Sequence, residues 1–146
     1  QLYSFMLTLH SYLRWAVIIV GIIALVMAWA GVFSRARWTP QQVTLGRLAT
    51  IAFDTQAVVG ILLYAWLSPI TTSAFRDMGA AMKDASVRFY VAEHSLIMIV
   101  AAVLVHIGVL LSRKKNSPLQ AAIFYTLAMA GVFALTPWSR GLLPGL

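Results

Sequence analysis

The feature that most constrains this chain is an apolar run, residues 15–33, that contains no charged side chain. A helix that crosses a bilayer needs about 20 mostly apolar residues, and three further apolar runs follow this one. The predicted spans are residues 7–33, 48–67, 88–112 and 119–135. Only 10% of the 146 residues are charged, whereas soluble domains are about a quarter charged. We therefore predict an all-α fold, an integral membrane four-helix bundle that forms one domain over residues 1–146.

The composition excludes several classes of site. The chain has no cysteine, which excludes disulfides, thiolate metal sites, iron–sulfur clusters and covalently attached c-type haem. A net charge of +7 would favour nucleic-acid binding in a soluble protein, but here the basic residues gather in the predicted loops. We therefore expect the lipid bilayer as a partner and no nucleic acid. No hydrolase or phosphate-loop motif is present, so a stand-alone hydrolase or transferase is excluded.

The connections between the predicted spans carry turn and charge signals. The first loop, residues 34–47, holds three arginines and Pro40, which we interpret as a turn-forming residue. The second span should stop at Ser68 and Pro69 because proline disfavours continuing a helix. In the loop that follows, Phe75, Met78 and Met82 recur at helical spacing, which predicts a short amphipathic helix on the membrane surface.

Basic residues predict the orientation in the membrane. The first and third loops contain the larger share: Arg35, Arg37, Arg47, Arg113, Lys114 and Lys115. The positive-inside rule places these two loops in the cytoplasm. Both termini then lie outside, which in a Gram-negative bacterium is the periplasmic side of the inner membrane.

The third predicted span is unusual because it carries Glu93, His94 and His106. A bilayer tolerates such groups mainly where they face protein, water, a metal or a cofactor. His10 and Arg14, four residues apart on one helical face of the first span, fall near the same outer depth as Glu93 and His94.

Two neutral imidazoles from different helices at one depth are what a b-type haem needs as axial ligands. We therefore predict a haem b bound by His10 and His94, with Arg14 paired either with a haem propionate or with Glu93. The alternative is that His10 is an interfacial histidine and His94 a packed residue that bonds a neighbouring hydroxyl or carbonyl.

A second polar layer is predicted near the inner face. His106 lies roughly 18 Å deeper than His94 at 1.5 Å per residue, and the same spacing rotates the two side chains by about 120°. Asp54 and Gln56 of the second span fall close to the depth of His106. We predict an Asp54–His106 hydrogen bond, or a small polar pocket with Gln56 that holds a quinone headgroup. The alternative is a polar pair that only locks the two helices together.

Three stretches of sequence carry a resemblance: LHSYLRW in the first span, FDTQAVVGILLY in the second and RFYVAEHSLIMIVAAVLVHIG in the third. In these the chain resembles small four-helix bacterial membrane proteins labelled cytochrome b-like, of the Bacteroidetes type. The resemblance would cover nearly the whole chain and implies His10, His94 and His106 as positions for haem ligands. Unlike diheme cytochromes b, the chain has too few histidines for two bis-histidine haems.

These observations leave three classes of function. The first is a membrane electron-transfer protein, or a subunit of a respiratory-type oxidoreductase complex, that binds one haem near the outer face. The second is a cofactor-free structural accessory subunit of a larger membrane complex. The third is a small proton- or solute-conducting bundle that uses Asp54, Glu93 and His106. In the first two classes the expected partners are other membrane subunits.

Overall fold

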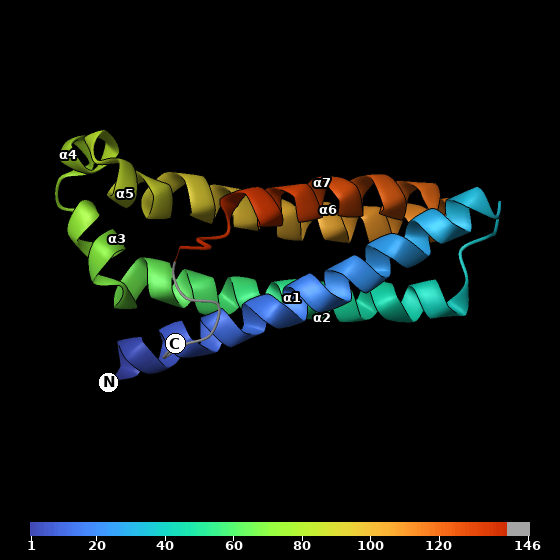
Figure 1. The fold of residues 1–146 in the computed structure, drawn as a ribbon, viewed down its shortest axis with the longest axis horizontal. Helices are drawn as coiled ribbons and strands as arrows, with labels where there is room; N and C mark the ends of the chain where they lie inside the picture. The colour runs from blue at the N-terminus through green and yellow to red at the C-terminus, as the bar shows by residue number, and fades with distance from the viewer. Residues whose placement is uncertain (140–146) are drawn as a thin grey trace.

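The computed structural model describes residues 1–139, and every regular element in that part of the chain is helical (Figure 1). The all-α prediction is therefore confirmed. The elements, in order, are α1 (Leu2–Phe33), α2 (Pro40–Leu62), the π-helical η1 (Leu63–Leu67), α3 (Pro69–Ala74), α4 (Met78–Lys83), α5 (Ala85–Arg88), the π-helical η2 (Phe89–Glu93), α6 (His94–Lys115) and α7 (Leu119–Leu135).

Three continuous helices are long and apolar enough to cross a membrane. They are Leu2–Phe33, Pro40–Leu67 and Ala85–Lys115, and the apolar helix α7 is shorter at 17 residues. Large apolar side chains face outward along them, including Phe33, Trp66 and Leu110, each more than 60% exposed. An outward apolar surface of this extent is what contact with lipid requires.

The long helices pack in pairs. α6 lies along α7, α1 lies along α2, and α1 also contacts α7 (Figure 1). Small side chains fill the contacts, among them Ala28, Ala101, Ala121, Ala122 and Ala128, all at most 1% exposed. Small residues let helix backbones approach closely, which is the usual packing mode inside a bilayer.

The first connection is shorter than predicted because Pro40 begins α2 instead of forming a turn. Proline suits the first helical position, where its missing N–H would have no partner. Thr39 and Gln42 form a capping box: the Gln42 amide donates to Thr39 Oγ1 at 3.3 Å, and the Thr39 amide donates to Gln42 Oε1 at 3.0 Å. Gln42 Nε2 also donates to the Met27 carbonyl at 2.9 Å, which ties α2 to α1.

At the opposite end of the bundle the second long helix stops at Ser68, as predicted, and Pro69 begins α3. The predicted amphipathic helix forms as separate short helices. Asp77 and Asp84 each cap a new one, because their carboxylates accept from the Ala80 amide at 2.9 Å and from the Ser86 amide at 2.8 Å.

The two basic connections lie at one end of the molecule. The Trp38 amide donates to the Asn116 carbonyl at 3.4 Å, which joins the α1–α2 loop to the α6–α7 loop. Asn116 ends α6 in the left-handed conformation with φ of 50°. α3, α4 and α5 cover the other end (Figure 1). The bundle therefore has one strongly basic end and one end of mixed charge.

Candidate histidine site

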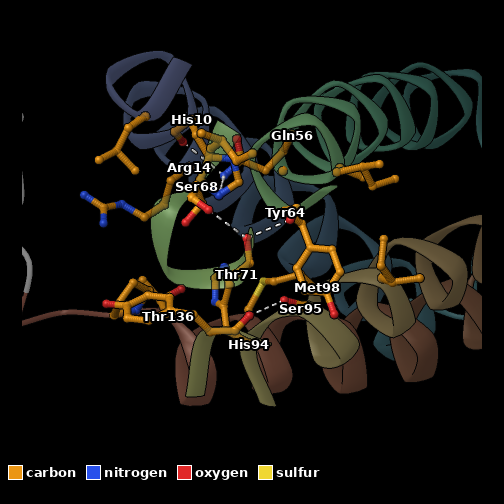
Figure 2. Close-up of a pocket in the computed structure, with 18 of the residues that line it drawn as sticks. His10, Arg14, Gln56, Tyr64, Ser68, Thr71, His94, Ser95, Met98 and Thr136 are labelled. Carbon is orange, nitrogen blue, oxygen red and sulfur yellow. Dashed lines mark hydrogen bonds between the residues drawn. The ribbon is translucent and has the colours of Figure 1, made fainter. Parts of the chain in front are cut away.

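A cavity of about 670 Å³ lies at the end of the bundle that carries α3. Its wall is mostly apolar and comes from α1, α2, η1, η2, α6 and α7 as well. The polar side chains labelled around it in Figure 2 are His10, Arg14, Gln56, Tyr64, Ser68, Thr71, His94, Ser95 and Thr136. Cofactor pockets in proteins measure about 300–1,000 Å³ and combine an apolar wall with a few convergent polar groups.

The predicted outer histidines meet in this cavity. The ring centres of His10 and His94 are 6.4 Å apart and their planes make an angle of 76°. His10 comes from the early turns of α1 and His94 from the first residue of α6. The structure therefore brings together two histidines from different helices that were expected at one depth.

His94 is oriented by the backbone of α7. Its Nδ1 lies 2.8 Å from the Leu135 carbonyl oxygen, which can only accept, so Nδ1 is the donor of this hydrogen bond. This is the carbonyl bond expected under the alternative interpretation, and it is also the contact that fixes metal-ligating histidines. Phe89 stacks on the ring with centres 5.8 Å apart.

His10 is held by Gln56 of α2. The Gln56 amide nitrogen donates to the His10 carbonyl at 3.1 Å and lies 3.3 Å from His10 Nε2. His10 Nδ1 and Gln56 Oε1 are buried and have no hydrogen-bond partner among the described residues. A buried polar atom without a partner costs about 1–3 kcal/mol, so this pair is poorly satisfied by the protein alone.

The placement of Gln56 corrects the prediction that grouped it with Asp54 and His106. Side chains two residues apart on an α-helix are rotated by about 200° about its axis, so Gln56 and Asp54 face different sides of α2. α2 also begins eight residues earlier than predicted, at Pro40 rather than Leu48, so both side chains lie eight residues further from the start of their helix than expected.

Glu93 and Arg14, which were predicted as a possible ion pair near the histidines, have different surroundings in the structure. Glu93 pairs with Arg88 through Arg88 Nε at 2.9 Å, and both side chains are partly exposed. The ion pair that the structure shows for Glu93 therefore involves Arg88 rather than the predicted Arg14. Arg14 lines the cavity one turn after His10, with its Nε buried.

Two π-helical segments shape the wall of the cavity. Tyr64 of η1 donates through its hydroxyl to the Val91 carbonyl of η2 at 3.0 Å, and Thr71 Oγ1 donates to the Tyr64 carbonyl at 2.7 Å. Ser95 Oγ donates to the Tyr90 carbonyl. A π-helical turn leaves carbonyls without their regular helical partners, and these hydroxyls satisfy them.

The inner polar pair forms away from the cavity. His106 Nε2 lies 2.8 Å from Asp54 Oδ1, so the predicted hydrogen bond between the second and third long helices is present. The side chains are 45% and 52% exposed on the outer surface of α2 and α6. The rotation of His106 away from His94 is confirmed as well, because His106 does not line the cavity.

Sequence reasoning missed Tyr64 and the true neighbourhood of Gln56. A signal was present, because Gln56, Gly60 and Tyr64 recur every four residues and so share one face of the second long helix. Gly60 provides the space for His10: a Cβ at Gly60 would lie 3.2 Å from His10 Cε1.

Comparison with protein-family models, with curated proteins and with solved structures gives no match. The site must be interpreted from its own geometry.

Proposed function

We propose that this chain is an integral membrane electron-transfer protein that binds one b-type haem between His10 and His94. The observation that carries the proposal is the 6.4 Å between the two ring centres. A ligating nitrogen lies about 2 Å from its metal and roughly 1 Å from its ring centre, so two axial imidazoles have centres about 6 Å apart. A haem held there supplies a one-electron carrier.

The ligand set favours haem over a bare metal ion. Zinc takes three or four protein ligands, and residues 1–139 contain no group of three or more histidine, cysteine, aspartate or glutamate side chains placed to hold a metal. A porphyrin brings four nitrogens of its own and needs only two axial ligands.

The protein groups around the histidines fit such a cofactor. The Leu135 carbonyl fixes the orientation of the His94 ring through Nδ1, which is how metal-ligating histidines are usually held by their second ring nitrogen. The apolar wall accommodates a macrocycle, and the guanidinium of Arg14 suits a propionate. His10 needs to exchange only its 3.3 Å contact with Gln56 for a bond to iron.

The membrane location is part of the proposal. α7, with 17 residues, is at the short end of the range for a spanning helix, and we include it as the fourth span beside the three longer ones. The association with a respiratory-type complex is an extension of the same proposal, supported by the outward apolar faces of the long helices.

The alternative of a cofactor-free accessory subunit is favoured by one observation, the double contact of the Gln56 amide with His10, which would lock α1 to α2 without any cofactor. A haem-loading experiment separates the two.

The test is a reduced-minus-oxidised optical spectrum of the full chain, purified in detergent after expression with added haem. We expect one b-type haem per chain, lost in His10→Ala and in His94→Ala. His106→Ala is the matched control, because it removes the histidine outside the cavity and should keep the spectrum. Absence of a Soret band in a chain that is fully helical by circular dichroism contradicts the proposal.

A further inference from the structure

The Asp54–His106 pair is exposed on a surface that the long helices would present to lipid. Both residues belong to helices long and apolar enough to span a membrane. Arg47 precedes Asp54, and Arg113 follows His106, by seven residues on the respective helices, which is about 10 Å of rise. The pair therefore lies about 10 Å along the helices from these basic residues, within the lengths of both candidate spans.

Apolar side chains surround the pair. Ile51 and Val58 lie one turn before and after Asp54 and are 61% and 57% exposed. Val103 and Leu110 stand in the same relation to His106 and are 51% and 62% exposed. We call these six residues the α2–α6 face. Ionisable groups inside a membrane face protein or a water-filled cavity rather than acyl chains, so this face requires a cover.

We propose that the α2–α6 face packs against the same face of a second copy of this chain. A two-fold axis along the membrane normal keeps both copies at one depth, so Asp54 of one copy meets His106 of the other. The imidazole has two ring nitrogens and the carboxyl group two oxygens, and the Asp54–His106 hydrogen bond within one copy uses one of each. The second nitrogen and the second oxygen of each pair can therefore bond across the axis, so that two pairs close a hydrogen-bonded ring that a single copy cannot form.

A small ligand fits the observations less well. Asp54 and His106 lie outside the 670 Å³ cavity. A quinone headgroup, the ligand predicted for this layer from the sequence, needs an enclosing pocket, whereas an outward face needs a matching surface. The proposal is independent of the haem at His10 and His94, which lie on the cavity side of the bundle.

Cysteine cross-linking in native membranes tests this directly, because the chain has no cysteine of its own. Because the axis sets α6 of one copy against α2 of the other, the matched positions are Val103 and Val58, which lie on the same side of the pair on helices that run in opposite directions. Two differently tagged chains, one with Val103→Cys and one with Val58→Cys, are co-expressed, and we expect oxidation to join them by a disulfide. Leu127→Cys on α7, where the residue is 54% exposed, replaces Val103→Cys in the control and should not be joined to Val58→Cys. Equal cross-linking in the two experiments, or none between Val103→Cys and Val58→Cys, overturns the proposal.

Two further variants, made in both the Val103→Cys and the Val58→Cys chains, separate dimerisation from folding. Replacing both Asp54 and His106 by leucine removes the ring, and we expect cross-linking to fall roughly tenfold. Ile51→Trp adds bulk to the face and leaves the pair intact, and it should reduce cross-linking as well. Unchanged cross-linking in both contradicts the proposal, as does protection by an added quinone. The haem spectrum of each variant shows separately whether the histidine site is loaded.

Discussion

Gly60 decides how closely α1 and α2 approach at the histidine site. Alanine at a helical glycine normally stabilises a helix by up to about 1 kcal/mol. At Gly60 the new Cβ would lie 3.2 Å from His10 Cε1, closer than most real contacts, and the Gln56 amide holds His10 in place. We therefore expect Gly60→Ala to lower the free energy of unfolding.

The matched control is Gly79→Ala in α4, where the added Cβ would meet only Asp77 Oδ1 at 3.5 Å. This variant should be neutral or more stable. Thermal unfolding of both proteins in detergent measures the difference. A Gly60→Ala protein more stable than the parent would mean that the His10 ring moves aside freely.

The sequence predicted how far along its helix each side chain of the site lies, but not which side of the helix it faces. His10 and His94 share a depth that follows from counting residues along two apolar runs, and the structure brings them together. Gln56 was misplaced because depth alone groups it with Asp54, whereas rotation about the helix separates the two. The Arg88–Glu93 pair was hidden for a related reason: the π-helical turn between those residues leaves no mark in hydropathy.

At the scale of elements, the short helix α5 depends on a titratable cap. Hydrogen bonds from the Ser86 side chain, then from the Val87 and Ser86 amides, lower the pKa of Asp84 below its ordinary value of 3.8. A carboxylate with a lowered pKa in the folded state stabilises that state above the ordinary pKa. The stabilisation disappears as the pH falls through the lowered value.

We therefore expect the amides of Ser86 and Val87 to lose protection from hydrogen exchange as the pH is taken below 3.8. Asp84→Asn keeps a capping oxygen that does not titrate, so its protection, corrected for intrinsic exchange, should change little over the same range. Equal pH dependence in both proteins would show that another group controls α5.

Helix ends were predicted better than helix beginnings. The ends at Phe33, Leu67 and Leu135 agree with the structure, because proline or polar residues follow each of them. The third end was placed at Ser112, three residues before Lys115. The first three beginnings were placed too late, at residues 7, 48 and 88 instead of Leu2, Pro40 and Ala85, whereas the fourth span begins at Leu119 as predicted. A hydropathy boundary marks where the sequence becomes apolar, whereas Pro40 with its capping box starts the helix within polar sequence.

At the scale of the whole molecule, the separation of charge between the two ends predicts orientation. The Trp38–Asn116 bond places both arginine- and lysine-rich connections at one end, and α3 to α5 lie at the other (Figure 1). From the positive-inside rule we predict that the basic end lies in the cytoplasm and the histidine cavity towards the outside.

Single cysteines report this orientation, since the chain has none of its own. In intact cells a membrane-impermeant maleimide should label Gly79→Cys and not Ser34→Cys, and permeabilised cells should show labelling of both. Labelling of Ser34→Cys alone in intact cells would reverse the assignment.

Under the proposed electron-transfer function, the one-sided position of the histidine pair would limit the direction in which an electron can move. From His94 to the end of α6 at Lys115 the helix rises about 31 Å, and the described part of that path holds no second pair of facing histidines. An electron that reaches a carrier at His10 and His94 would therefore leave on the side from which it came. Turnover would then be electrically silent, and a change in membrane potential should leave its rate unaltered.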